Sequence, residues 1–212
     1  MTLEGGEGSG KTTQALRLCQ SLTAQGYDVL HTREPGGTSV AERLRGILLD
    51  RSDEAIAPET EALLILAARR QHVDHVIRPA LARGRLVVCD RFSDSTMAYQ
   101  GYARGLDLKQ LRAMNRWATG GLTPHLTVLF DLPIAIGLRR RRGHGNSQNR
   151  LDLETHRFHS DVRAGFQALA KREPRRIKIV DAQPSPDSVA AAVETLVLDW
   201  LRTTHSPKRQ RR

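Results

Sequence analysis

The stretch that decides the fold lies close to the start of the sequence and reads Gly5-Gly6-Glu7-Gly8-Ser9-Gly10-Lys11-Thr12. It has the form Gly-x-x-x-x-Gly-Lys-Thr and stands between a short apolar segment and a helical pattern. Glycines let the chain curl so that backbone N–H groups converge on phosphate oxygens, and the next helix points its positive N-terminus at the same anion. The pattern predicts a loop that binds a nucleoside triphosphate.

Two side chains of this loop have separate predicted roles. Lys11 is expected to reach the β- and γ-phosphates, and the Thr12 hydroxyl to coordinate Mg²⁺. The full set of residues expected to hold the nucleotide is Gly5, Gly6, Glu7, Gly8, Ser9, Gly10, Lys11, Thr12 and Thr13.

Short apolar runs alternate with longer helical patterns over the rest of the chain. The runs cover residues 28–31, 86–89, 126–130 and 177–180, and three of them are nearly continuous in apolar residues, as in strands buried on both faces. Helical patterns cover residues 10–25 and 58–83, and Val189, Val193, Leu196, Val197 and Trp200 form an apolar stripe on a last helix. The alternation predicts βαβ units and a parallel sheet with helices on both sides.

Two segments fit this organisation less well. The first strand would contain only Thr2, Leu3 and Glu4, so either the sequence starts late or this strand is weakly paired. With 212 residues the chain has the size of one domain, which we expect over residues 1–202. The basic tail, residues 203–212, lacks apolar periodicity, and we expect it to be disordered.

Composition excludes several classes of protein. Hydrophobic residues make up 39% and charged residues 26%, which is a globular balance. No apolar run approaches the roughly 18 residues that span a bilayer, and no signal-peptide pattern precedes the loop. Two cysteines, Cys19 and Cys89, cannot form a disulfide framework. We therefore expect a cytoplasmic protein with no membrane partner.

The net charge of +10 is concentrated in two clusters. Four positive charges lie at residues 139–142 and four in the tail, and without these eight the chain would be near +2. Because the basic residues are not spread over one face, no specific nucleic-acid partner is expected.

Asp90 and Arg91 follow the apolar run at 86–89. In an open parallel sheet the carboxyl ends of the strands line the ligand crevice. Asp90 is therefore expected to hold Mg²⁺, directly or through water, and Arg91 to hold a phosphate. A salt bridge at the strand end is the alternative.

Three further motifs follow the loop in order. They are Thr-Arg-Glu-Pro-Gly-Gly-Thr at 32–38, Ala-Ala-Arg-Arg-Gln-His at 67–72 and Asp-Arg-Phe-Ser-Asp-Ser-Thr-Met-Ala-Tyr-Gln-Gly at 90–101. The ordered set resembles the thymidylate kinases of the bacterial type, from residue 2 to about residue 200. The resemblance implies an α/β P-loop kinase fold, with a five-stranded parallel sheet and helices on both faces. It also implies a homodimer that uses ATP and Mg²⁺ to phosphorylate dTMP to dTDP.

The resemblance further implies the residues that bind dTMP. Arg33 and Arg91 would grip the acceptor phosphate, for which a bidentate guanidinium is suited. Glu7 would help to place the sugar, Arg69 would contact thymine, and the pair at 99–100 would read deoxyribose and base. The full expected set is Glu7, Arg33, Ile65, Arg69, Arg91, Ser95, Tyr99 and Gln100.

One departure from the family pattern concerns base binding. The family has phenylalanine where this chain has Ile65, one helical turn before Arg69. Stacking of a base on an aromatic ring is worth roughly 1–3 kcal/mol in single-strand binders, so we expect weaker acceptor binding. Asn149 and His125 each stand where aspartate is usual, and neither change is expected to abolish catalysis.

Residues 138–150 combine five arginines, two glycines and polar side chains, the composition of a mobile lid. An arginine on the transferred phosphoryl group is worth roughly 10³ to 10⁵ in rate. The loop carries Ser9 and no arginine, so the arginine-rich lid, about residues 139–152, is expected to supply it. The resemblance implies Arg150 as one donor, with Arg142 or Arg140 as the second. The expected catalytic set is Lys11, Arg91, Arg142 and Arg150.

Three other functions compete with this one. A kinase of another nucleoside monophosphate, such as dUMP, or one with relaxed base choice would share the fold and the mechanism. A P-loop regulator that binds nucleic acid would instead use the arginine cluster and the tail, with an affinity that falls steeply with salt. A relative that has lost activity would lack some of the expected catalytic residues, and none is missing.

Overall fold

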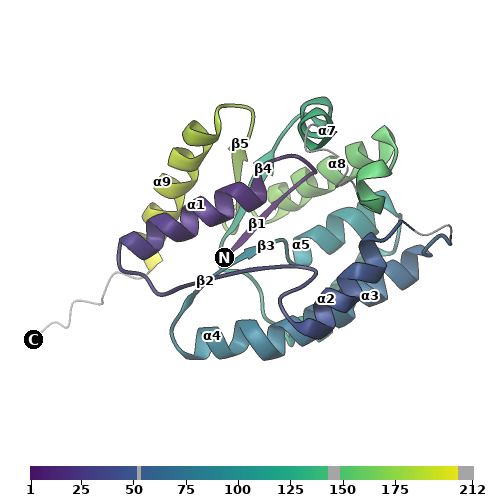
Figure 1. Cartoon of the computed structure of the whole chain (residues 1–212), viewed down its shortest axis with the longest axis horizontal. Helices are drawn as coiled ribbons and strands as arrows, with labels where there is room; N and C mark the ends of the chain where they lie inside the picture. Colours follow the sequence, from purple (N-terminus) through teal and green to yellow (C-terminus); the bar gives the residue numbers. More distant parts are fainter. Residues whose placement is uncertain (52–53, 143–148, 205–212) are drawn as a thin grey trace, which may run out of the picture.

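The computed structural model describes residues 1–51, 54–142 and 149–204. Its centre is a sheet of five parallel strands, as predicted, and their order is β2-β3-β1-β4-β5 (Figure 1). The strands are β1 (Thr2–Gly5), β2 (Val29–Arg33), β3 (Leu86–Asp90), β4 (Thr127–Asp131) and β5 (Ile177–Asp181).

The alternative that β1 is weakly paired is wrong. This strand lies in the middle of the sheet, where Leu3 stands opposite Asp90 on one side and Val128 on the other. All four of its residues are buried. A short strand is sufficient here because neighbours on both sides satisfy its backbone, so the phosphate-binding loop leaves from the most rigid part of the sheet.

Two helices cover one face of the sheet (Figure 1). They are α1 (Lys11–Ala24) and α9 (Pro186–Thr204), and their apolar stripes pack on strand residues such as Val88 and Val128. The predicted stripe on the last helix is therefore confirmed, since Val189, Val193 and Val197 are all buried in this cluster.

The other face of the sheet carries the remaining long helices and several short helical segments. They are α2 (Ser39–Leu49), α3 (Pro58–His72), the π-helical η1 (Val73–Ile77), α4 (Arg78–Ala82), α5 (Ser93–Thr96), the π-helical η2 (Met97–Ala103), α6 (Leu108–Thr119) and α8 (His156–Arg172). Between β4 and α8 lie α7 (Ile134–Arg142) and the short 3₁₀ helix η3 (Arg150–Leu153). The helix predicted over 58–83 is present, but it widens at η1. Pro79 has no N–H to donate to the preceding turn, which explains why the regular hydrogen-bond ladder is interrupted just before it.

Parts of the predicted lid and the predicted tail, residues 143–148 and 205–212, lie outside the described residues. Among the described residues, no helix combines the length and the apolar character that crossing a bilayer requires.

Candidate active site

The phosphate-binding loop joins the end of β1 to the start of α1. Gly8 adopts a φ of 67° and approaches the backbone of α7 so closely that a Cβ atom would collide with the carbonyl of Gly137. The Lys11 ammonium folds back over the loop and donates to the Gly6 carbonyl at 2.8 Å and to Ser9 Oγ at 3.2 Å. Burial, together with the nearby Arg91, lowers the pKa of Lys11 to about 8. An anion in the loop would favour its charged form further.

Thr12 and Asp90 meet beside this loop. The Thr12 hydroxyl, in the first turn of α1, donates to Asp90 Oδ2 at 2.5 Å from the end of β3. Mg²⁺ usually keeps several waters and takes only one or two protein oxygens besides substrate phosphates. One hydroxyl and one carboxylate fit that requirement, and the described residues hold no group of three or more ligating side chains that would suit another metal.

Two cavities meet at the loop. The larger, about 820 Å³, is lined by the loop and by residues after β5, including Pro184 and Pro186. The smaller, about 130 Å³, lies between α2, α3 and η2. Residues that line both are Glu7, Glu34, Arg45, Arg91 and Asn149. A donor nucleotide in the larger cavity would therefore face an acceptor in the smaller one, which we call the acceptor cavity. The lining that the two cavities share forms a wall between them, and this wall carries Arg45 and Arg91.

Arg91 is the centre of this wall. It is the one non-glycine residue with a positive φ, 69°, among the described residues, and that turn aims its guanidinium at Glu7 and Tyr99. Nη2 of Arg91 lies 2.8 Å from Glu7 Oε1, to which the Tyr99 hydroxyl also donates at 2.7 Å. Burial alone would raise the pKa of Glu7, but Arg91, Lys11 and Tyr99 lower it to about 2. Glu7 is thus an ionised acceptor between two cations.

A buried carboxyl group behind Arg91 holds its turn in place. Glu4 Oε1 accepts the Phe92 N–H at 2.8 Å, and Glu4 Oε2 accepts the Ser95 hydroxyl at 2.5 Å. Burial and the neighbouring Asp94 raise the pKa of Glu4 to about 8. Ser95, predicted to bind substrate, lines the acceptor cavity, but its hydroxyl already donates to Glu4 and accepts from Arg91 at 3.2 Å.

Arg69 lies almost fully buried at the end of the acceptor cavity. Its Nε donates to Glu34 at 2.7 Å, its Nη1 to Thr96 and Asn115, and its Nη2 to the Phe92 carbonyl. A guanidinium has five N–H groups. Four are used in these contacts, so the described residues leave one, on Nη2, for a ligand.

Gln100 and Ile65 also line the acceptor cavity. The Gln100 amide nitrogen donates to Glu61 at 2.7 Å, and its Oε1 is buried with no partner among the described residues. Ile65 is half-buried and stands with other apolar side chains of the cavity, namely Pro35, Leu48, Leu49 and Leu151. No aromatic side chain replaces the missing phenylalanine on that side of the cavity, since Tyr99 is the only ring among the lining residues.

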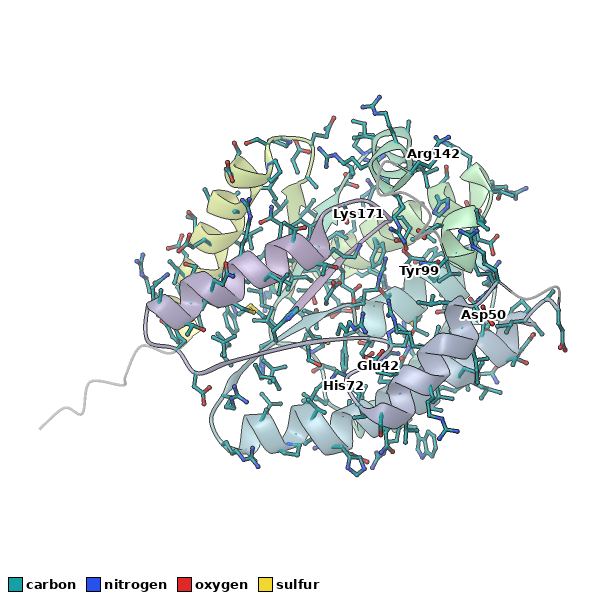
Figure 2. All side chains as sticks on the ribbon, in the orientation of Figure 1. Glu42, Asp50, His72, Tyr99, Arg142 and Lys171 are labelled. Carbon is teal, nitrogen blue, oxygen red and sulfur yellow. The ribbon has the colours of Figure 1, made fainter. Side chains whose placement is uncertain are left out.

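The arginines of the predicted lid take different positions. Arg140 donates to the carbonyls of Ala182 and Gln183, and Arg141 pairs with Asp152 at 2.9 Å. Both line the larger cavity, whereas Arg142 is exposed at the end of α7 and lines neither cavity (Figure 2).

Arg150 lies on the acceptor side of the site. Its guanidinium donates to the Leu48 carbonyl at 3.1 Å and pairs with Glu61 at 2.5 Å. Asn149 caps η3 and lines both cavities. The structure thus brings Arg150 to the acceptor cavity and does not bring Arg142 to either one.

Arg33, predicted to hold the acceptor phosphate, does not line the acceptor cavity. Arg45, which was not predicted, does line it. Arg33 is half-exposed, pairs with Glu42 at 2.9 Å and lines only the larger cavity. Arg45 lines both cavities and anchors itself on the Pro35 carbonyl at 3.0 Å. A signal existed, because Arg45 shares one helical face with Ala41 and Leu48, the buried residues of α2.

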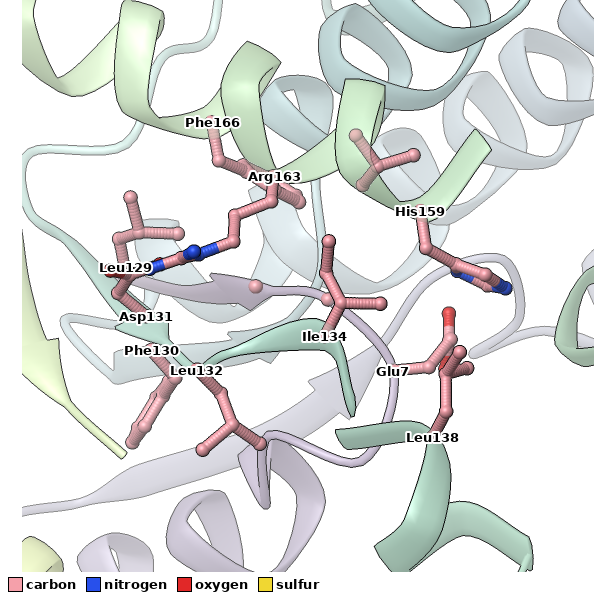
Figure 3. A pocket seen from close by; sticks show the side chains of 13 residues that line it. Glu7, Leu129, Phe130, Asp131, Leu132, Ile134, Leu138, His159, Arg163 and Phe166 are labelled. Carbon is pink, nitrogen blue, oxygen red and sulfur yellow. Dashed lines mark hydrogen bonds and ion pairs between the residues drawn. The ribbon is translucent and has the colours of Figure 1, made fainter. Parts of the chain in front are cut away.

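Behind the loop lies a third, very small cavity of about 20 Å³ (Figure 3). Figure 3 shows Glu7 and His159 pointing toward one another across it. His159 Nε2 is buried with no partner among the described residues, and burial lowers the pKa of His159. The space is sufficient for about one water molecule, so this cavity is too small to hold a nucleotide.

A phosphate-binding loop, an adjoining hydroxyl–carboxylate pair and a second cavity across an arginine wall define a P-loop phosphotransferase acting on a nucleotide-sized acceptor. Comparison with known proteins narrows this class. The thymidylate kinase family model matches residues 3–193. The chain is 51% identical to the thymidylate kinase of Thermomicrobium roseum, over 100% of this chain and 97% of that one. It is 52% identical to that of a Synechococcus species, over 93% of each chain, and 51% identical to that of Solidesulfovibrio magneticus, over 91% and 95%.

The chain belongs to the thymidylate kinase family, and the resemblance predicted from the four motifs is confirmed. It is therefore a nucleoside monophosphate kinase, and ATP is its phosphoryl donor.

Proposed function

We propose that this enzyme transfers the γ-phosphoryl group of ATP to the phosphate of dTMP, giving dTDP and ADP. The observation that carries the proposal is the pair of cavities that share Glu7, Arg45 and Arg91. The acceptor phosphate is already ionised near neutral pH, so catalysis needs positioning and charge compensation and no general base.

On the donor side, Lys11 and the loop N–H groups would hold the phosphates of ATP. Thr12 and Asp90 would hold Mg²⁺, which when bound would neutralise charge on the β- and γ-phosphates. Arg140 and Arg141, already at this cavity, would add positive charge. The catalytic roles of Arg142 and Arg150 require the lid to move and remain predictions.

On the acceptor side, Arg45 and Arg91 would grip the phosphate of dTMP. The free N–H of Arg69 suits the O4 carbonyl of thymine, and the unpartnered Oε1 of Gln100 suits the ring N3–H. The Tyr99 ring, fixed by its bond to Glu7, would pack against the sugar and exclude a 2′-hydroxyl by steric contact.

The Ile65→Phe variant is expected to lower the KM for dTMP by about tenfold, because it supplies the aromatic face that the cavity lacks. The measurement is acceptor-dependent ADP release with a panel of dTMP, dUMP, dGMP, dCMP, UMP and AMP. The parent enzyme is expected to prefer dTMP. An unchanged KM for dTMP would contradict the role given to position 65, and a different preferred acceptor would contradict the proposed substrate.

We also propose a homodimer formed through one face of α3 and α6. Leu63 and Trp117 are 56% and 77% exposed, which is unusual for large apolar side chains. The exposed alanines Ala67 and Ala113 lie one turn from them on the same helix faces. The two helices run together, since Arg70 at the end of α3 lies beside Gly120 at the end of α6.

The Trp117→Glu variant is expected to shift the enzyme from dimer to monomer, because it places a charge on this apolar face. Light scattering coupled to gel filtration gives the mass directly. Leu16→Glu, at an exposed apolar residue of α1 on the opposite face of the sheet, is the matched control and is expected to stay dimeric. A monomeric parent, or a variant that remains a dimer, would contradict the assignment.

A cytoplasmic location is supported by two features. The substrate ATP is abundant there, and both cysteines of the chain, Cys19 and Cys89, are free thiols.

A further inference from the structure

Glu61 is a fully buried carboxylate on α3, with 1% of its surface exposed. Its Oε1 accepts the Gln100 amide nitrogen at 2.7 Å and Arg104 Nε at 3.3 Å. Its Oε2 accepts Arg104 Nη2 at 3.1 Å and Arg150 Nη2 at 2.5 Å. Both oxygens are thus fully engaged at the wall of the acceptor cavity.

The ionisation of Glu61 follows from these contacts. Burial alone would raise the pKa of Glu61, but hydrogen bonds from Arg104, Arg150 and Gln100 hold it below its usual value. Glu61 is therefore a carboxylate, and a carboxylate can only accept hydrogen bonds.

An acceptor-only neighbour fixes the orientation of the Gln100 amide. A glutamine amide has a donating and an accepting end of nearly equal shape, and in most surroundings it can turn over. Here the flipped amide would set its carbonyl oxygen against a charged oxygen of Glu61 at hydrogen-bond distance. Only the orientation with nitrogen toward Glu61 is favourable, which leaves Oε1 as the end without a protein partner.

We propose that Glu61 is a positioning residue that sets base choice, by forcing Gln100 to present an acceptor to the base in the acceptor cavity. Such a site admits a pyrimidine with an N–H at ring position 3, as in thymine, and rejects one with a lone pair there, as in cytosine. The proposal rests on the base-reading role of Gln100 proposed above.

The decisive comparison uses dTMP and 5-methyl-dCMP as acceptors, because these two differ only at ring positions 3 and 4. The ratio measured is kcat/KM for dTMP divided by kcat/KM for 5-methyl-dCMP. The Glu61→Gln variant is expected to lower this ratio by about tenfold or more, since a neutral amide at position 61 lets the Gln100 amide turn over. Loss of discrimination comes chiefly from a gain with 5-methyl-dCMP, which a merely loosened fold would not produce.

Two variants separate this role from a structural one. Arg104→Gln removes a cation from the same cluster but leaves Glu61 facing Gln100, and it is expected to keep the ratio. The double variant Glu61→Gln with Gln100→Glu exchanges the two groups, keeps a carboxylate in the cluster and again offers the base only acceptors. It is expected to restore the ratio, and it remains informative if Glu61→Gln alone does not fold.

The Gln100→Leu variant separates the base-reading role of Gln100 from the positioning role of Glu61. An unchanged ratio in Gln100→Leu would overturn the base-reading role of Gln100 and this inference with it. A lowered ratio in Gln100→Leu with a parental ratio in Glu61→Gln would overturn the inference alone. Equal losses in Glu61→Gln and Arg104→Gln, or no recovery in the exchanged double variant, would also overturn it.

Discussion

Replacing Lys11 with alanine is expected to lower kcat by about 10²- to 10³-fold, with the fold unchanged. The magnitude is that of removing one preorganised donor from a site where charge develops in the transition state. Lys11 is the buried cation of the loop, held by Gly6 and Ser9 at the mouth of the larger cavity. Negative charge accumulates there as the phosphoryl group moves, and alanine cannot compensate for it.

The fold is expected to survive this change because the ammonium gives little to stability. Burial lowers the pKa of Lys11 to about 8, so the folded protein holds its charged form less easily than water does. Coupled ADP release gives kcat, and thermal unfolding checks the fold. Lys171→Ala, at an exposed position of α8 labelled in Figure 2, is the matched control and should keep parental turnover. Near-parental turnover in Lys11→Ala would contradict the assignment of the loop.

The fold could be predicted from the sequence because its signals are local. The loop motif fixes the end of one strand and the start of one helix, and nearly continuous apolar runs indicate strands buried on both faces. The position of β1 could not be predicted in this way. Strand order depends on contacts distant in sequence, such as Leu3 with Asp90 and Val128, and a four-residue strand carries too little pattern to place itself.

The residues of the site could be predicted only where they belong to a recognisable motif. Thr12 and Asp90 were each predicted to hold Mg²⁺, and the structure places their side chains within hydrogen-bond distance of one another. The orientation of Gln100 could not be predicted, because it depends on Glu61, a carboxylate 39 residues earlier in the chain that belongs to no motif. Arg69 was predicted to contact the base. The sequence did not indicate that most of its N–H groups donate to other residues of the protein.

The Glu34→Gln variant is expected to destabilise the enzyme by about 3–5 kcal/mol, the usual cost of breaking a buried ion pair by removing one partner. The Glu34 side chain is 3% exposed and that of Arg69 is 2% exposed, so water cannot replace the lost charge. Glu34 Oε1 also lies 3.0 Å from His72 Nδ1, whose ring reaches Thr32 at 2.7 Å. One substitution therefore leaves a buried guanidinium uncompensated and disturbs a second hydrogen bond.

Urea unfolding of the two proteins gives this difference, and Glu42→Gln is the matched control. Glu42 pairs with Arg33 at 2.9 Å, but the two side chains are 41% and 49% exposed. An exposed pair is worth only about 0–1 kcal/mol, because water solvates both charges when they separate. The KM for dTMP is expected to rise in Glu34→Gln as well, since Glu34 orients the guanidinium whose remaining N–H we propose to contact the base. Equal and small losses of stability in the two variants would show that Arg69 finds another partner when Glu34 is neutral. The buried pair would then not be what fixes Arg69 in the acceptor cavity.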